Sequence, residues 1–306
     1  MPVVKVDEFR EYLLDLQDRI CAAAEDFEES ARFHRDHLEG ERKGFARPRV
    51  LSGGKVFERA AVSFSWSGGE ELSPAATLTR PQLRGKAYQA VSLSMIFHPL
   101  NPHAPTSHMN LRLFVAGEGA DSHWWFGGGF DLTPIYGVDA DAIRWHQAAR
   151  DALQPFGEQV YPEMKAACDE YFYLRHRQEP RGIGGVFYDD LNSGGFERCR
   201  DLSMAVGEAF LGTYFAIVRE RSTVPYGESE RRFQLERRGR YVEFNLLQDR
   251  GTLYGLQAGA RVESVLASMP PTVQWAYDRK EKPGSREAEL YTRYLVPRDW
   301  ADMPLL

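Results

Sequence analysis

Residues 88–98 read Tyr88-Gln-Ala-Val-Ser-Leu-Ser-Met-Ile-Phe-His98, and residues 108–115 read His108-Met-Asn-Leu-Arg-Leu-Phe-Val115. In both stretches apolar residues take every second position, and this period of two is typical of β-strands. We therefore expect two strands, each with an apolar face toward a core and a polar face. Because the polar faces carry Ser, His, Asn and Arg where a solvated face would carry Lys, Glu and Thr, they indicate a site for an anionic ligand.

The rest of the chain divides into helical and extended segments around these strands. Spacings of three and four, with Asp7 and Asp139 as candidate N-caps, predict helices over Val6–Phe27, Asp139–Leu153, Pro162–His176, Phe196–Arg221 and Arg261–Ser268. Alternation predicts further strands over Val62–Trp66, Ser122–Phe126 and Ile183–Tyr188, and a hairpin of Tyr241–Leu247 and Thr252–Leu256 around Asp249-Arg-Gly251. This order favours one α+β domain over residues 1–306, with a large, mostly antiparallel sheet flanked by helices.

The composition is that of an ordinary soluble globular protein. Of the 306 residues, 43% are hydrophobic and 27% are charged, and the net charge is -6. This charge disfavours general binding to nucleic acid or anionic membranes, so local arginines must hold any anionic substrate. No run approaches the ~18 apolar residues that a membrane span needs, and the first residues carry no apolar signal core. We therefore expect a cytoplasmic protein with no integral membrane span.

The three cysteines, Cys21, Cys168 and Cys199, are isolated from one another in the sequence. They form no CxxC pair, no iron–sulfur spacing and no disulfide framework. We expect them to be reduced, partly buried thiols.

Three arginines lie in contexts suited to an anion. Arg112 lies on a polar strand face, Arg181 precedes Gly-Ile-Gly-Gly, and Arg261 opens a predicted helix whose free N–H groups favour negative charge. Since arginine binds a carboxylate through two parallel hydrogen bonds, these residues predict a ligand with several carboxylates. The arginines between residues 231 and 240 are interleaved with glutamates, which is typical of a solvated helix face.

Histidine and aspartate supply the candidate acid–base groups. His98 and His108 lie on the polar strand faces, whereas His146 and His176 lie in predicted helices. Neutral imidazoles act as acids and bases near pH 7 or bind transition metals, but His146 and His176 taken singly are more often structural. Asp131 follows three glycines that would let a flat ligand lie against bare backbone. The alternative for this segment is a tight turn capped by Asp131.

Four longer motifs stand out along the chain. They are His98-Pro-Leu-Asn-Pro-His-Ala-Pro-Thr-Ser-His-Met-Asn-Leu-Arg112, Trp124-Trp-Phe-Gly-Gly-Gly-Phe-Asp-Leu-Thr-Pro134, Arg181-Gly-Ile-Gly-Gly-Val-Phe-Tyr-Asp-Asp190 and Tyr254-Gly-Leu-Gln-Ala-Gly-Ala-Arg-Val-Glu-Ser264. Together they resemble the oxygen-dependent coproporphyrinogen III oxidases, in order from about Val6 to Trp300. Leu100 departs from the pattern, because relatives often carry Arg or Lys after His-Pro, and one expected carboxylate contact is lost.

The resemblance implies an oxidative decarboxylation in haem biosynthesis. Two propionates of coproporphyrinogen III become vinyl groups, giving protoporphyrinogen IX, with O2 as co-substrate and release of two CO2. A divalent metal cation of unknown identity is a candidate cofactor, and no flavin, nicotinamide or iron–sulfur cluster is expected. The implied fold is a single α+β domain that acts as a homodimer, with residues 241–275 associated with dimerisation.

The resemblance also assigns roles to residues of this chain. The positions linked to substrate are Ser94, Asn110, Leu111, Arg112, Gly259, Ala260 and Arg261, and our interpretation of the arginines adds Arg181. His108 is implied as the proton donor, and Asp131 is expected to accept hydrogen bonds from the pyrrole N–H groups. The implied metal ligands are His98, His108, His146 and His176.

Two other functions stay open at this point. One is a non-haem metal oxygenase or hydrolase in which His98, His108 and Asp131 form a facial triad. The other is a non-catalytic carrier, which would bind a tetrapyrrole and never release CO2.

Overall fold

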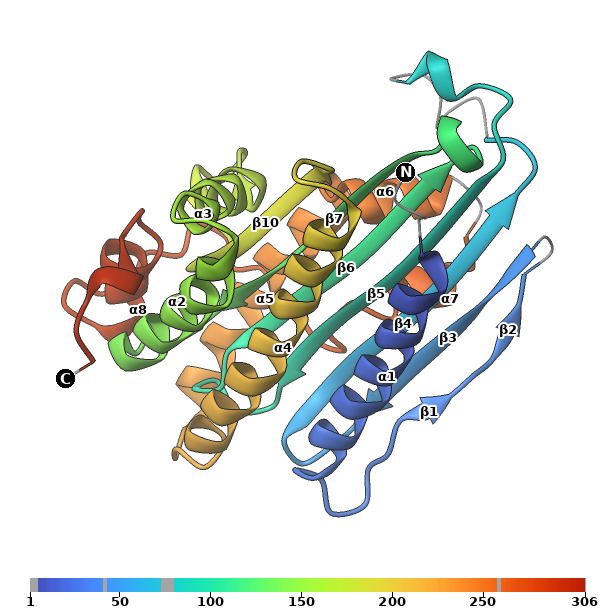
Figure 1. The fold of residues 1–306 in the computed structure, drawn as a ribbon. Helices are drawn as coiled ribbons and strands as arrows, with labels where there is room; N and C mark the ends of the chain where they lie inside the picture. Colours follow the sequence, from blue (N-terminus) through green and yellow to red (C-terminus); the bar gives the residue numbers. More distant parts are fainter. Residues whose placement is uncertain (1–4, 41–42, 73–79, 258–259, 306) are drawn as a thin grey trace.

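The computed structural model describes residues 5–40, 43–72, 80–257 and 260–305. An eight-stranded antiparallel sheet, in the order β1-β3-β4-β5-β6-β7-β10 with β2 also paired to β3, forms its centre (Figure 1). The strands are β1 (His34–Arg35), β2 (Leu38–Glu39), β3 (Lys43–Ser52), β4 (Phe57–Gly69), β5 (Tyr88–Pro99), β6 (Thr106–Ala116), β7 (His123–Thr133) and β10 (Gly184–Leu191). The predicted α+β fold with a large antiparallel sheet is confirmed.

One face of the sheet is covered by three helices, α1 (Val6–Glu25), α2 (Asp139–Leu153) and α4 (Phe196–Arg221) (Figure 1). The apolar positions of the alternating strands, such as Leu93, are fully buried beneath them. Helix α4 packs closely because residue 207 is glycine, where a Cβ would come within 2.5 Å of the Tyr12 hydroxyl. By length and composition α4 could cross a membrane, but 56% of its apolar window is buried inside the fold, as in a core helix.

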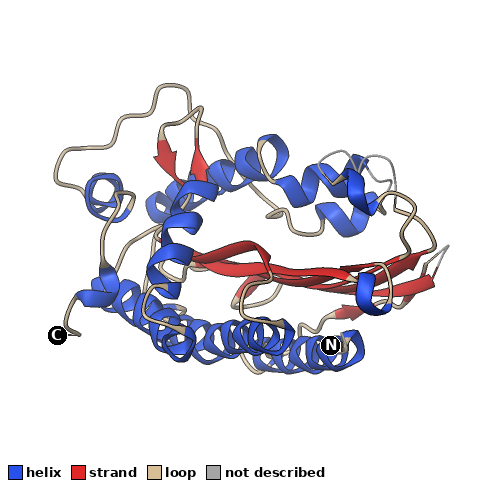
Figure 2. Ribbon diagram, turned by 45° about the horizontal axis from the view of Figure 1, so that its top comes forward, coloured by secondary structure: helices blue, strands red, loops and turns tan. Residues whose placement is uncertain are grey.

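The other face of the sheet carries α5 (Glu228–Leu247), α6 (Arg250–Gln257) and α7 (Val262–Leu266), and Figure 2 shows the sheet between the two helical layers. Tyr241 of α5 packs with Ile96 of the sheet. Helix α3 (Val160–Tyr171) runs along β10, and a small hairpin of β8 (Tyr173–Leu174) and β9 (Glu179–Pro180) follows it. The short α8 (Arg286–Glu289) lies near the C-terminus (Figure 1).

Element boundaries agree with the sequence prediction in some places and differ in others. The predicted bounds of α2 and α4 are confirmed, whereas α1 ends at Glu25 and α3 ends at Tyr171. The N-caps of α1 and α2 are Lys5 and Val138 without side-chain hydrogen bonds, so the expected capping by aspartates is wrong. Strand β7 continues through the three glycines to Thr133, so the tight-turn alternative for Asp131 is also wrong.

The predicted hairpin around Asp249 is wrong, because both of its arms are helical. Helix α5 runs through Leu247, and α6 begins at Arg250. Tyr241 and Phe244 are three residues apart on α5 and are both buried against the rest of the protein. Their spacing of three matches a helical face and not the period of two that a hairpin arm requires.

The arginines of α5 do not form the solvated face that their spacing predicted. Arg237 and Arg238 are 3% and 2% exposed and are each 2.6 Å from a glutamate, Glu179 and Glu58 respectively. These partners lie 58 and 180 residues away in the chain. Because α5 lies between the sheet and the C-terminal segment, tertiary packing rather than helix periodicity decides which arginines are buried.

Candidate functional site

Small side chains form much of the polar face of the sheet. One register row places Ser65, Ser92, Arg112 and Gly127 side by side on β4, β5, β6 and β7. The Ser65 and Ser92 hydroxyls are 2.9 Å apart, in one hydrogen bond. At Gly127 a Cβ would come within 2.6 Å of the Arg112 guanidinium, so the missing side chain makes room for Arg112. The polar face that the alternation predicted is therefore continuous. Gly127 leaves space for the Arg112 side chain rather than for a ligand.

The next row contains two predicted substrate residues. Ser94 pairs with Asn110, which in turn pairs with Gly129 of β7. Arg112 Nη1 donates to Asn110 Oδ1 at 3.3 Å, so the amide and the guanidinium point toward each other. Leu111, between them on β6, is fully buried on the opposite, apolar face. Its side chain therefore cannot contact a ligand on the polar face.

Asp131 is the centre of a three-residue cluster at one end of this face. It is 2% exposed, and Arg181 Nη2 donates to both of its carboxylate oxygens at 2.8 Å. His108 Nδ1 lies 3.0 Å from Asp131 Oδ1, and the His108 side chain is 26% exposed. The order from inside to outside is thus arginine, carboxylate, imidazole. A ligand on the sheet would meet His108 first, with Nε2 as the ring atom available to it.

The charges of this cluster stabilise each other. Burial alone would raise the pKa of Asp131, but the Arg181 guanidinium and the His108 ring outweigh it and hold the pKa below its usual value. The rings of Phe172, Phe244 and Tyr241 surround the guanidinium, with their centroids 4.1, 4.6 and 5.2 Å from Arg181 Cζ. Cation–π contacts of this kind partly replace the water that the cation has lost.

Arg181 was predicted to bind a substrate carboxylate, and its position in the structure does not support direct contact. Its side chain is buried, its charge is paired with Asp131, and aromatic rings separate it from solvent. Any effect on a ligand must therefore pass through Asp131 and His108. Local sequence patterns do not predict this pairing, because the two residues are 50 positions apart.

His98 lies in a closed environment on the same side of the sheet. It is fully buried, and its Nε2 donates to the Ser268 carbonyl at 2.9 Å. Burial is the main reason why the pKa of His98 is lowered to about 3, and the nearby charge of Arg238 lowers it further. The ring is therefore neutral. His98 thus links β5 to the segment after α7.

His146 and His176 occupy two further environments. His146 on α2 is buried, with Nδ1 3.0 Å from the Tyr161 hydroxyl and Nε2 2.9 Å from the Ile183 carbonyl. Burial lowers the pKa of His146 to about 4. His176 follows β8 and lies 2.7 Å from Glu243 of α5. Both are hydrogen-bonded structural histidines, as each one taken singly suggested.

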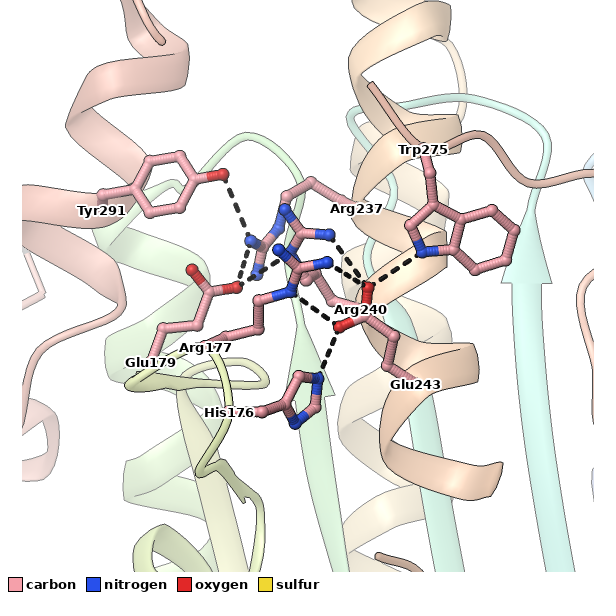
Figure 3. A network of polar contacts seen from close by, with 8 residues as sticks. All are labelled: His176, Arg177, Glu179, Arg237, Arg240, Glu243, Trp275 and Tyr291. Carbon is pink, nitrogen blue, oxygen red and sulfur yellow. Dashed lines mark hydrogen bonds and ion pairs between the residues drawn. The ribbon is translucent and has the colours of Figure 1, made fainter. Parts of the chain in front are cut away.

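Glu243 is the hub of the polar network in Figure 3. It accepts hydrogen bonds from Arg177, Arg240 and Trp275 as well as from His176. Burial alone would raise the pKa of Glu243, but the hydrogen bonds outweigh it and lower the pKa to about 2. Beside it, Glu179 accepts from Arg237 at 2.6 Å. The network connects the β8–β9 hairpin to α5. Glu179 of this hairpin is two residues before Arg181 in the chain.

The four histidines expected to hold a metal do not come together in this chain. They have the separate partners described above, and the described residues include no group of three or more His, Cys, Asp or Glu side chains placed to hold a metal ion. The same holds for the facial triad of His98, His108 and Asp131, since His98 is turned to Ser268. We therefore derive no chemical step through a metal, and the metal stays a sequence-based prediction.

Ala260 and Arg261 are the described residues of the predicted substrate segment after α6. Gly259 is outside the described residues, and Ala260 is exposed. Arg261 is the N-cap of α7, and its guanidinium lies 3.6 Å from Asp36 and 3.3 Å from Glu263. Its described ion pairs are thus with acidic residues of the surface rather than with groups of the sheet.

A hollow of about 900 Å³ opens elsewhere, between residues that include Lys43, Leu72, Tyr88 and Val115. Tyr88 and Asp131 lie near opposite ends of the sheet, because Asp131 pairs with His108, which pairs with Ile96 at the other end of β5. The hollow is therefore not part of the Asp131 cluster. Leu72 of its lining is the last described residue before 73–79, which are outside the described part of the chain.

Sequence reasoning missed two charged residues that contact Arg112 or its partner. Asp189 Oδ1 accepts from Arg112 Nη2 at 2.7 Å, and Arg250 Nη2 lies 3.1 Å from Asp189 Oδ2. The adjacent carboxylates Asp189 and Asp190 at the end of a predicted strand were the available signal. Arg250 falls in the predicted turn, where its side chain has no predicted direction.

Removing the charge of Asp131 should destabilise the fold. In the Asp131→Asn variant Arg181 stays buried without a counter-charge, and we expect the free energy of unfolding to fall by roughly 3–5 kcal/mol. Urea unfolding measures this loss. Adding Arg181→Met, which removes the uncompensated charge, should recover part of it. An Asp131→Asn variant as stable as the original protein would show that the pair contributes nothing.

One comparison with known proteins bears on the whole chain. A protein-family model described as coproporphyrinogen III oxidase matches residues 8–300 of the 306. The match begins within α1, ends at Trp300 and includes every strand of the sheet. Members of such a family are oxidoreductases of haem biosynthesis, and a tetrapyrrole substrate is implied. This chain belongs to the coproporphyrinogen III oxidase family.

Proposed function

We propose that this protein catalyses the O2-dependent oxidative decarboxylation of two propionates of coproporphyrinogen III, giving protoporphyrinogen IX. Each propionate would lose CO2 and two electrons to become a vinyl group, and O2 would take up the electrons with two protons as H2O2. The observation that carries the proposal is the cluster of Asp131, Arg181 and His108 at the edge of a polar sheet face that also holds Arg112. The family match supports it.

The cysteines favour oxygen as the oxidant. An oxygen-independent enzyme for this step would use radical chemistry on an iron–sulfur cluster, which needs closely spaced cysteine ligands. Cys21, Cys168 and Cys199 are far apart in the sequence, and all are buried as free thiols. Burial raises the pKa of each thiol, which disfavours the thiolate form that binds metal.

In the proposed mechanism His108 exchanges a proton with the substrate. Its Nδ1 is held by Asp131, so its Nε2 faces the ligand. The ionised carboxylate of Asp131, held by Arg181, would stabilise the imidazolium that forms, as a buried aspartate does in a catalytic dyad. Asp131 then acts through His108 instead of touching the pyrrole N–H groups, since it is almost fully buried.

Arg112 and Asn110 are the proposed ligands of a propionate. Both lie half-buried on the polar face and contact each other, which fixes their donors in one direction. Ser92, Ser94 and Gly127 lie beside them and have small side chains or none. A flat ring could therefore approach the backbone of the sheet at these positions. An arginine donating to a carboxylate through two hydrogen bonds would also orient the side chain that reacts.

We also propose that the active form is a homodimer. Large apolar side chains are exposed along one segment, over α5, α6, α7 and the chain that follows, namely Leu246, Leu247, Leu256, Val262, Leu266, Trp275 and Tyr277. Exposed apolar groups gathered in one region of a globular protein are typical of an interface between subunits. The segment overlaps residues 241–275, which the resemblance to the family associates with dimerisation.

The proposed activity predicts that CO2 release requires oxygen. Purified protein incubated with coproporphyrinogen III in air should release two CO2 per substrate and yield protoporphyrin after autoxidation, as measured by gas analysis and porphyrin fluorescence. The same mixture without oxygen should release none. Turnover without oxygen would contradict the oxygen-dependent reaction. Binding of the ring in air with no CO2 would indicate the carrier function instead.

Replacing His108 by glutamine should remove proton transfer while keeping a hydrogen bond to Asp131. We expect kcat to fall by ~10²–10⁴-fold, the range for losing a general acid–base group, with little change in Tm because the ring is partly exposed. His37→Gln, an exposed histidine bonded to Glu39, is the matched control. If the His108 variant keeps its activity, another group moves the proton.

Sedimentation velocity at micromolar concentration should show a dimer. Leu247→Glu, which adds a charge to the exposed segment, should shift the protein toward monomer, whereas Leu305→Glu near the C-terminus should not. A monomer at these concentrations for the unaltered chain would contradict the proposed assembly.

A further inference from the structure

Asp189 is bound by two guanidinium groups at once. Arg112, on the polar sheet face, reaches one carboxylate oxygen, and Arg250, the first residue of α6, reaches the other. The three side chains are accessible, with 37%, 28% and 62% of Arg112, Asp189 and Arg250 exposed. The pair of Asp131 and Arg181, in contrast, is closed to solvent.

A bulge in β10 places this carboxylate. Tyr188 pairs with Gly128 and Leu191 with Phe126, so Asp189 and Asp190 together face the single residue between them on β7. Asp190 has a φ of 55°, in the left-handed region that most side chains avoid. In regular alternation two successive side chains would point to opposite faces. Here Asp189 reaches Arg112, and Asp190 reaches Arg80, which stacks over Trp125 at 3.7 Å. Bulges of this kind redirect side chains next to active sites.

Arg250 is held in place for a ligand by groups other than Asp189. Its guanidinium lies over the Tyr171 and Phe187 rings, 5.0 and 5.9 Å from their centroids. The carboxylate of the adjacent Asp249 already accepts hydrogen bonds from Tyr171 and from Thr252. These donors satisfy Asp249, so it does not draw Arg250 away. Arg250 would therefore keep its position if Asp189 released it.

We infer that Asp189 is an internal stand-in for a substrate carboxylate, and that Arg250 is a second arginine of the same carboxylate site as Arg112. The inference rests on the proposed function, because coproporphyrinogen III offers four carboxylates. Two arginines share one carboxylate in the free protein, which leaves a net positive charge beside the sheet. An arriving propionate takes one or both guanidiniums from Asp189. The exposed ion pairs that it replaces are weak, so the exchange is easy.

The stand-in role predicts opposite effects for the two partners. Asp189→Asn removes the competing charge but keeps an oxygen that can accept from the Asp190 N–H, a contact of 3.1 Å in the protein. We expect it to tighten binding of the substrate analogue by roughly 3- to 10-fold, about one charge-assisted hydrogen bond or less. Arg250→Gln should weaken binding by roughly 10-fold or more. In the Arg250→Gln background, Asp189→Asn should have a smaller effect, because one of the freed arginines is missing.

The probe is coproporphyrin III, the oxidised ring with the same four propionates, which cannot be decarboxylated by the proposed route. Its fluorescence is titrated with the full-length protein and each variant at two salt concentrations. Asp190→Asn is the matched control, because it makes the same change one residue away, on a carboxylate that contacts Arg80. It should change the affinity by less than about 2-fold, on the scale expected of an exposed pair outside the site. Asp189→Ser serves as a second variant if Asp189→Asn has a lowered Tm.

Weaker binding by a folded Asp189 variant would show that Asp189 holds Arg112 in place, and would overturn the inference. Unchanged binding by Arg250→Gln would remove Arg250 from the site. The failure of the inference is separable from that of the proposed function. If the unaltered protein releases CO2 from coproporphyrinogen III while the variants bind the probe equally, only the inference fails. If the variants shift probe binding as expected and no CO2 is released, only the function fails.

Discussion

The buried ion pair of Asp131 and Arg181 is the interaction on which the rest of the site depends. Neither charge could be buried alone, because removing an ion from water costs several kcal/mol. Together they can be buried, and three aromatic rings from the α3 end and α5 close around the guanidinium. The pair thus requires β7, the chain after β9 and α5 to meet at one place. It also keeps Asp131 ionised and so determines how the His108 ring is turned.

The position of Arg181 is secured from the other side by the network in Figure 3. Glu179, two residues earlier, is bonded to the buried Arg237 of α5, and Glu243 joins the hairpin to the same helix. Since exposed ion pairs contribute little singly, several partners on one carboxylate are needed to hold a short hairpin firmly. The charged face of α5 that looked like a solvent-exposed surface in the sequence is therefore part of the scaffold of the site.

The sequence could predict what depends on local pattern. Alternation in 88–98 and 108–115 correctly predicted β5 and β6, and with them the shared polar face of Asn110 and Arg112. It could not predict pairs that folding brings together, such as Asp131 with Arg181, or the closed environment of His98. The bulge at Asp190 also breaks the alternation on which such reasoning relies, so the direction of Asp189 was hidden. The hairpin prediction around Asp249 was wrong for a local reason, because Tyr241 and Phe244 are three positions apart, which fits a helical face and not strand alternation.

Asp131 and Asp189 on this face are both paired with arginine but differ in burial, and burial decides what each carboxylate can do. The Asp131 pair is enclosed, so separating its charges costs several kcal/mol and no ligand can replace a partner. It can only orient and polarise what lies in front of it, which is His108. The Asp189 pairs are in contact with solvent, where an ion pair contributes about 0–1 kcal/mol. A ligand carboxylate can therefore take the place of Asp189 with little net change in energy. The same face therefore combines an enclosed pair that holds His108 in place with exposed pairs whose partners can be exchanged for an anion at low cost.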